Sequence, residues 1–362
     1  MRENYDVKED LTPRQRWLAV LRKRIPDRVP LDYWATNEVT KRLMAFLGCR
    51  SKKDLFLKLH IDAAISVGPK YVGPPILEDS DVYGCRYRKV RYGKGENSGV
   101  YRECVYHPLA KYRSVNEIKQ HYRWPDVDLY DYTVIEDQIS GWKDYPIIGG
   151  GSEPFLIYKH LRGETQAYID LIRNPDMVHY CLDKLFDFCY ENTKLIYEAA
   201  SGKVMISYIA EDFGSQTGLL YSPRHIREFF IPRMKRMIDL AHHYGVYAFF
   251  HSDGAIGEIV SDMIKVGIDI LNPIQWRCRG MDRESLKRDF GDLVVFHGGV
   301  DNQYTLAFGS EMEVREEVRS NIQILGRNGG YILAPCHNIQ TITPLRNIIA
   351  MYEEGYRAGI YL

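Results

Sequence analysis

The chain has 362 residues, of which 45% are hydrophobic and 27% are charged, and this composition is typical of a globular protein. Lys plus Arg and Asp plus Glu each total 48, so the formal net charge is zero, which argues against nucleic acid or a membrane surface as a partner. No apolar run has the length of a membrane span, and the charged first residues contain no signal-peptide core, so we expect a cytoplasmic protein.

The first half of the chain has an irregular order of elements. Residues 12–36 predict a helix, a turn and a first strand that ends near Trp34, and residues 62–68 predict a second strand. These two strands, with a helix before them, are the expected beginning of a larger sheet.

An insertion with a different pattern follows. Residues 74–108 alternate around a turn at 93–97, which predicts an inserted β-hairpin that serves as a lid or as a dimer contact. Residues 145–155 then resume a sheet strand, and residues 182–202 have the periodicity of an amphipathic helix.

The second half repeats one unit, in which a short apolar strand ends in polar residues and an amphipathic helix follows. The predicted strands are 203–214, 246–254, 268–275, 293–301 and 331–338, and the helices are 222–245, 255–267, 282–291, 310–329 and 343–359. Five such units imply parallel strands with helical crossovers. No Gly-x-Gly-x-x-Gly opens a helix, which disfavours a doubly wound nucleotide-binding sheet. We therefore predict a single (β/α)8 TIM barrel over residues 1–362, with an N-terminal helical extension.

In a β/α barrel the active site lies where the strands end. We predict catalytic roles for polar residues at these ends, namely Glu211, Asp212, His297 and Asp301. The residues predicted to bind substrate are Tyr33, Trp34, Gln275 and Asn338.

Three residues at the predicted mouth have the donor types of a zinc site. His251, Asp253 and Cys336 offer an imidazole, a carboxylate and a thiolate, and catalytic zinc commonly has three protein ligands and one open position. His251 and Asp253 are two residues apart, so in a strand they point to the same side. Glu211 is a candidate fourth ligand. The seven cysteines are scattered and odd in number, so they do not form a disulfide framework.

Each of these residues also has a structural interpretation. Asp253 could cap the next helix by binding the amides of Ile256 and Gly257. His251 could be a hydrogen-bonded histidine without metal, and Cys336 could be a plain buried thiol. Glu211 and Asp212 could bind backbone amides at the strand end, and His297 and Asp301 could hold loops in place. For His297 and Asp301 the loop-fixing role is favoured over direct catalysis.

Six stretches carry a resemblance to a known family. They are "IPDRVPLDYW" (25–34), "EDFGSQTGLLYSPRHIREFFIPRMKRMID" (211–239), "FHSDG" (250–254), "VGIDILNPIQ" (266–275), "FHGGVDNQ" (296–303) and "APCHNIQ" (334–340). With them the chain resembles the uroporphyrinogen decarboxylase superfamily over nearly its whole length. The resemblance implies a β/α barrel.

Two chemistries occur in that superfamily. Its decarboxylases use no metal and carry an Arg-Gln-Ala-Gly-Arg segment that binds substrate carboxylates. The corresponding residues 31–36 here read "LDYWAT" and contain no arginine. A tetrapyrrole with many carboxylates needs cationic partners, so this departure argues against that substrate.

The other branch contains cobalamin-dependent methyltransferases, which bind zinc through a His-x-Cys and a later Cys. His251 matches the histidine and Cys336 the later cysteine, whereas Asp253 stands where the family has cysteine. A carboxylate leaves zinc harder than a thiolate does, which favours activation of an oxygen over capture of a thiol.

The resemblance therefore implies a zinc-dependent methyltransferase that moves a methyl group between a methoxy compound and the cobalamin of a separate corrinoid protein, as in O-demethylation. Glu211 or Asp212 would orient a ligand or manage a proton. The resemblance also implies a homodimer. The alternative is a metal-independent decarboxylase that acts on a smaller acid.

Overall fold

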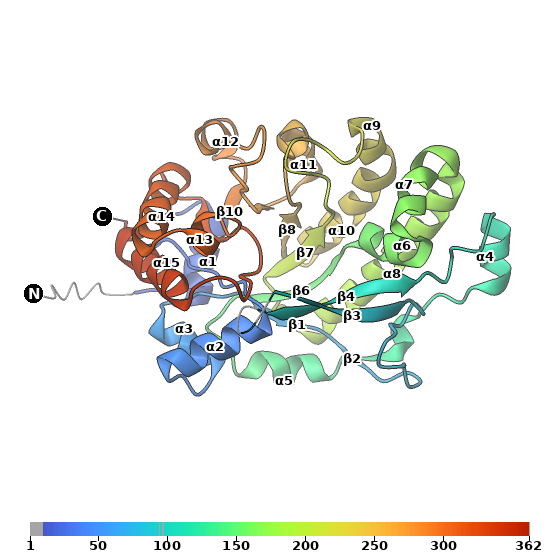
Figure 1. Cartoon of the computed structure of the whole chain (residues 1–362), viewed down its shortest axis with the longest axis horizontal. Coiled ribbons are helices and arrows are strands. Elements are labelled where there is room, and N and C mark those ends of the chain that lie inside the picture. Colours follow the sequence, from blue (N-terminus) through green and yellow to red (C-terminus); the bar gives the residue numbers. More distant parts are fainter. Residues whose placement is uncertain (1–9, 94, 96–97, 362) are drawn as a thin grey trace, which may run out of the picture.

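Seven parallel strands curl around the centre of the molecule in the computed structural model, which describes residues 10–93, 95 and 98–361 (Figure 1). Their order is the order of the chain, β1-β6-β7-β8-β9-β10-β11. The strands are β1 (Ile65–Val67), β6 (Ile147–Ser152), β7 (Ile206–Ala210), β8 (Tyr247–His251), β9 (Ile270–Asn272), β10 (Val295–Val300) and β11 (Tyr331–Pro335). Each lies within a segment that the sequence predicts as a strand.

The segment around Leu31 closes the ring between the two edge strands, β1 and β11. Leu31 forms a parallel bridge with Leu333 of β11. On its other side, the carbonyl of Leu31 accepts a hydrogen bond of 2.7 Å from the amide of Asp62, shortly before β1. Eight chain segments therefore surround one interior, and the predicted (β/α)8 barrel class is confirmed.

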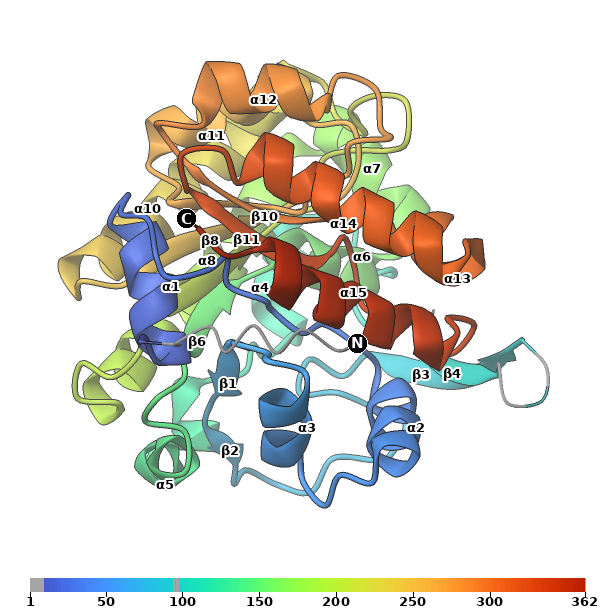
Figure 2. The same ribbon diagram turned by 90° about the vertical axis from the view of Figure 1, so that its left-hand side faces the viewer.

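Helices cover the outside of this ring (Figures 1 and 2). They are α2 (Asn37–Leu47), α3 (Lys52–Lys58), α4 (Val115–His121), α5 (Val134–Ser140), α6 (Pro154–Arg162), α7 (Glu164–Arg173), α8 (Pro175–Ala199), α9 (Pro223–His225), α10 (Ile231–His243), α11 (Val260–Val266), α12 (Arg283–Phe290), α13 (Thr305–Phe308), α14 (Glu311–Leu325) and α15 (Leu345–Ala358). The described helices include none that is long and apolar enough to cross a membrane.

The helix predicted over 222–245 is interrupted. Ser222 caps its start by accepting a hydrogen bond from the amide of His225, as its position predicts. Residues Ile226–Phe230 then form a π-helical turn before α10 begins. Pro232 has no amide hydrogen for the α-helical ladder, which accounts for the wider turn at this point.

The predicted N-terminal helix, α1 (Pro13–Leu21), packs against the barrel interior. Trp17 and Val20 are fully buried and belong to one apolar cluster with residues near the amino-terminal ends of the strands; these residues are Ile206, Ile270, Val295 and Ile332. Thr12 and Gln15 form a capping box at the start of α1. The helix therefore closes the end of the barrel opposite to the predicted mouth. That residues 1–362 form one domain stays a prediction.

The predicted hairpin is present as β3 (Arg86–Tyr92) and β4 (Gly99–Tyr106), which pair antiparallel. Residues 94 and 96–97 of the predicted turn lie outside the described residues. The two strands form an arm that projects from the barrel (Figure 2). The hydroxyl of Tyr92 donates to Oε1 of Gln340 at 2.7 Å, so the arm contacts the loop that follows β11. A second small sheet pairs β2 (Lys70–Tyr71) with β5 (Tyr130–Asp131).

Candidate metal centre

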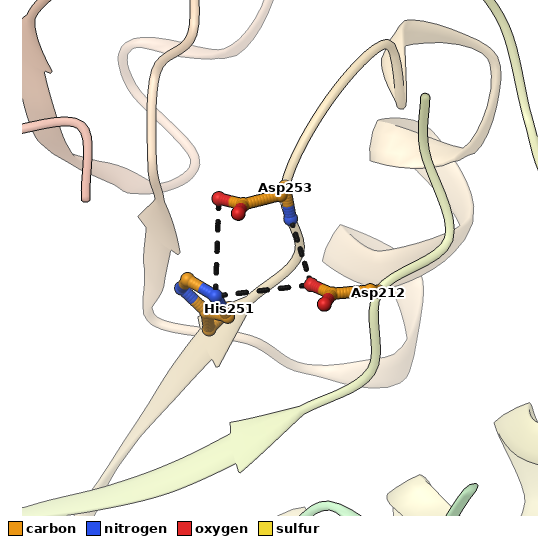
Figure 3. Close-up of side chains that lie close together, drawn as sticks. All are labelled: Asp212, His251 and Asp253. Atoms are coloured by element: carbon orange, nitrogen blue, oxygen red, sulfur yellow. Dashed lines mark hydrogen bonds and ion pairs between the residues drawn. The ribbon is translucent and has the colours of Figure 1, made fainter. Parts of the chain in front are cut away.

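Three side chains from the ends of β7 and β8 converge at the mouth of the barrel (Figure 3). In the described part of the chain, Asp212, His251 and Asp253 are the group whose possible ligand atoms all lie within 4.8 Å of one another. Nε2 of His251 lies 3.8 Å from Oδ1 of Asp212 and 3.9 Å from Oδ1 of Asp253. The register of the two parallel strands pairs Ala210 with His251, and this pairing brings the following residues side by side.

The carboxylate of Asp253 points towards the space above the imidazole of His251 (Figure 3). Its Oδ1 is buried and has no hydrogen-bond partner. The interpretation of Asp253 as the cap of the next helix is wrong, because no side chain caps that helix and the amide of Ile256 bonds to the carbonyl of Gly254. Burial raises the pKa of Asp253, and the nearby His251 and His337 act in the opposite direction.

These donors fit a divalent metal such as zinc. An imidazole and two carboxylates are accepted zinc ligands, and the three atoms face one space. The separations of 3.8 and 3.9 Å are too long for hydrogen bonds, so no donor satisfies the buried oxygen of Asp253. A buried carboxylate oxygen without a partner is costly, and a cation bound between these atoms would remove that cost.

Cys336, the predicted thiolate ligand, lies apart from these three atoms. Its Sγ donates to the carbonyl oxygen of Ile274 at 3.4 Å, and burial raises the pKa of the thiol well above its ordinary value. The cysteine is therefore held as a buried thiol, and Asp212 is the third residue of the group that could hold a metal.

Two further carboxylates lie near the metal centre. Glu211 is buried and accepts a hydrogen bond of 2.8 Å from the amide of Phe155 at the start of α6. Burial raises its pKa well above the ordinary value. Glu153, which the sequence analysis did not select, follows β6, and burial together with the charge of Asp212 raises its pKa to about 7. The site thus gathers carboxyl groups that burial keeps partly protonated, and a bound cation would favour their ionised forms.

The second ring nitrogen of His251 faces away from the metal centre. Nδ1 of His251 lies 2.5 Å from Oδ1 of Asn272, and Nδ2 of Asn272 lies 2.6 Å from Nδ1 of His297. Nε2 of His297 lies 2.9 Å from Oδ2 of Asp32, which also accepts a hydrogen bond from the indole of Trp34. His297 is fully buried within this network.

A cavity of about 430 Å³ opens beside the metal centre. Its lining residues come from the Leu31 segment, β1, β6, β7, β8 and the loop after β11; they are Asp32, Tyr33, Trp34, Ala35, Ala64, Ser66, Val67, Ile148, Gly149, Gly150, Tyr208, Phe249 and Asn338. The ring centroids of Trp34 and Tyr208 lie 5.8 and 5.5 Å from that of His251. The volume is that of a small-molecule site.

The predicted substrate-binding residues divide between two places. Tyr33, Trp34 and Asn338 line the cavity, whereas Gln275 accepts a hydrogen bond from the amide of Gly254. Gln275 thus supports the loop that carries Asp253.

Asp301 fixes the loop that follows β10. Its carboxylate pairs with Nε of Arg277 at 2.6 Å and accepts hydrogen bonds from the amides of Gln303 and Thr305. These contacts match the loop-fixing interpretation, and Asp301 is not part of the Asp212–His251–Asp253 group.

Sequence reasoning assigned no role to Asp32, Asn272, Glu153, Tyr208 or Phe249. A signal for two of them was present, because Asp32 and Glu153 are polar residues near the carboxyl ends of predicted strands and the strand-end rule applies to them equally. Tyr208 and Phe249 lie within apolar strands, and the sequence does not say which face of a strand lines a cavity.

Comparison with known proteins places the chain among proteins of related fold. Residues 106–357 match the family described as Uroporphyrinogen decarboxylase (URO-D). A solved structure described as a methyltransferase from Methanosarcina mazei is 20% identical and has a TM-score of 0.66, with 96% of this chain and 99% of that chain covered. A D-tagatose 3-epimerase-like protein (12% identity, TM-score 0.35) covers 62% of this chain and 82% of its own. Among curated proteins, no sequence matches this chain significantly.

Proposed function

Because the chain belongs to the uroporphyrinogen decarboxylase (URO-D) family, we propose that it is a zinc-dependent methyltransferase of that family. It would move a methyl group between a methoxylated small molecule and the cobalamin of a separate corrinoid protein. The likeness of fold to the methyltransferase from Methanosarcina mazei, over 96% of this chain, supports this choice among the chemistries of the family. A cytoplasmic location and a homodimer belong to the same proposal.

One observation carries the metal-dependent part of the proposal. A buried oxygen of Asp253 without a hydrogen-bond partner faces Nε2 of His251, and a carboxylate oxygen of Asp212 completes the group. Asp212, His251 and Asp253 would hold the zinc, and Cys336, the third ligand predicted from the sequence, would join them only if its thiol left the carbonyl of Ile274. When bound, zinc supplies a Lewis acid that polarises the substrate oxygen and stabilises the charge on the leaving group.

The cavity supports a flat, neutral substrate. Its walls include Trp34, Tyr208 and Phe249, whose rings suit the face of an aromatic ether. Among the residues that line it, Asp32 is the one charged side chain, and its carboxylate is already bonded to His297 and Trp34. An anionic substrate would find no cationic partner in this lining.

Glu153 is suited to move the proton that a leaving oxygen requires. Without a bound metal, burial and the charge of Asp212 raise its pKa to about 7, so both protonation states are accessible near neutral pH, as an efficient acid–base group requires. Glu211, which holds the start of α6, would keep this side of the mouth in place. The cobalamin of the partner protein supplies the methyl acceptor.

The decisive experiment combines metal analysis with a transfer assay. Protein purified without chelator is expected to contain zinc, and His251→Ala to lose it, whereas His243→Ala, at an exposed position, retains it. Cob(I)alamin on a corrinoid protein should become methylated when a methoxylated aromatic compound is added. Absence of zinc from the wild type would overturn the metal centre, and release of carbon dioxide from a small acid without a corrinoid protein would establish a decarboxylase instead.

A further inference from the structure

A buried row of hydrogen bonds leads from Asp32 to the metal centre. It passes through His297 and Asn272 and ends at Nδ1 of His251, with donor–acceptor distances of 2.9, 2.6 and 2.5 Å. The exposed fractions of Asp32, His297, Asn272 and His251 are 1%, 0%, 0% and 5%. Water has little access to these groups, so each must be satisfied by its neighbour.

Asp32, the first residue of the row, determines which atom donates and which accepts in every hydrogen bond that follows. The carboxylate of Asp32 accepts from the amides of Tyr33 and Ala64 and from the indole of Trp34, and it has no hydrogen to give. Nε2 of His297 must therefore carry the hydrogen that it shares with Asp32. A neutral imidazole has one N–H, so Nδ1 of His297 is an acceptor.

The remaining two bonds are then fixed. Nδ1 of His297 accepts from the amide NH₂ of Asn272, so the carbonyl oxygen of Asn272 faces His251. That oxygen can only accept, and Nδ1 of His251 therefore carries the hydrogen. Nε2 of His251 is left with its lone pair, and this is the atom that faces Asp212 and Asp253 (Figure 3).

We propose that Asp32, His297 and Asn272 are positioning residues that hold His251 in the Nδ1–H tautomer and so present its Nε2 to the metal. The proposal rests on the metal-dependent part of the proposed function. Outer partners of metal-binding histidines fix the ring orientation and the tautomer, and their loss commonly weakens metal binding about 10- to 100-fold. Here the outer partner of His251 is the neutral amide of Asn272. The charged group that fixes the direction of the hydrogen bonds is Asp32, which lies two members further along the row.

The first test needs neither a variant nor a metal. Metal-free wild-type protein is labelled with [¹⁵N]histidine, and the imidazole nitrogens of His251 are assigned by their loss in His251→Gln. The expected result is a protonated Nδ1 and an unprotonated Nε2. At a pH where the ring is neutral, a protonated Nε2 together with an unprotonated Nδ1 in His251 would overturn the proposal, because the row of bonds would then run in the other direction.

The second test measures zinc affinity by competition with a chromophoric chelator. Asn272→Leu removes both hydrogen bonds at similar volume and is expected to bind zinc about 10- to 100-fold more weakly than the wild type. The matched control is Asn347→Leu. Asn347 is also buried, but it donates to the carbonyls of Leu306 and Gly309 and is not part of the row. This variant should bind zinc with wild-type affinity.

The outcomes separate the two proposals. Equal zinc affinity in the wild type and a folded Asn272→Leu variant, as judged by circular dichroism, would overturn the role of the row. A wild type that binds no zinc overturns the proposed metal centre instead, and the tautomer measured in metal-free protein still decides the direction of the row. If Asn272→Leu does not fold, the wild-type spectrum alone gives the answer.

Discussion

The residues of the metal centre show how one position can be interpreted in two ways until its neighbours are known. Asp253 was an equally reasonable helix cap or metal ligand, and the cap is excluded because no side chain caps the helix that follows. His297 is buried in a hydrogen-bonded row and does not reach the Asp212–His251–Asp253 group. Its position suits a positioning residue better than a catalytic one.

The identity of the third ligand can be tested by a pair of substitutions. Asp212→Asn should lower zinc affinity by more than the roughly 10- to 100-fold typical of an outer partner, because it removes a carboxylate that lies 3.8 Å from Nε2 of His251. Cys336→Ser should have a smaller effect, since its thiol bonds the carbonyl of Ile274. Equilibrium zinc titration measures both. The opposite ranking would show that Cys336 moves into the site when metal binds.

Glu153 should make the stability of the metal-free protein depend on pH. Its pKa in the folded protein, about 7, is higher than the ordinary value of 4.5, so the folded state binds more protons between these values and loses stability as pH rises through them. Glu153→Gln removes this loss. In chelator, the variant should be about 3 kcal/mol more stable than the wild type at pH 8 and nearly equal to it at pH 4.5, as measured by urea unfolding.

The matched control for that experiment is Glu258→Gln, at an exposed position. It should leave the free energy of unfolding unchanged at both pH values. A gain for Glu153→Gln that is the same at pH 4.5 and pH 8 would contradict the linkage to ionisation of this carboxylate.

At the scale of elements, the amino-terminal ends of the strands stabilise the barrel, whereas the carboxyl-terminal ends carry the candidate site. The amino-terminal ends pack against α1 in an apolar cluster, whereas the carboxyl-terminal ends carry the metal centre and the cavity. This division is the rule for β/α barrels. The hairpin of β3 and β4 adds a contact at the loop after β11 through Tyr92 and Gln340.

The packing of α1 should contribute strongly to stability. Trp17 is fully buried at the centre of the cluster, so Trp17→Ala should lower the free energy of unfolding by about 3–5 kcal/mol through the cavity it leaves. Urea unfolding in the presence of chelator measures the loss. Ile25→Ala, at a position that is 58% exposed, should change the free energy by less than about 0.5 kcal/mol. A loss below about 1 kcal/mol in Trp17→Ala would show that α1 contributes little to closing the barrel.

At the scale of the whole molecule, the cavity exists because the ring of strands is closed. Its walls combine residues from the Leu31 segment, several strands of the sheet and the loop after β11. Asp32 and Asn338, which lie near opposite ends of the sequence, therefore face one volume of about 430 Å³ next to His251.

The charge of this lining predicts the substrate preference. A neutral methoxylated aromatic compound should bind at least about 10-fold more tightly than the same ring with an added carboxylate, because the lining offers no cation to pair with that charge. Quenching of tryptophan fluorescence or calorimetry measures both affinities. Tighter binding of the carboxylated compound would contradict the proposed substrate class and favour an acid as the substrate.

Much of the architecture was determined by the sequence itself. Apolar strands alternating with amphipathic helices predicted parallel strands, and the polar residues after each strand located the mouth. His251 and Asp253 were predicted to face one ion from their spacing of two, and the structure brings them together with Asp212. These features depend on local periodicity, which one segment of chain contains by itself.

The tertiary structure alone decided which side chains meet. The register of β7 and β8 places Asp212 beside His251, and the bond to the carbonyl of Ile274 holds Cys336 apart. The row from Asp32 to Asn272 joins the Leu31 segment to β10 and β9, which are distant from it in the chain. Such contacts depend on how the strands align around the barrel, and a shift of register changes them without altering the local pattern of any single strand.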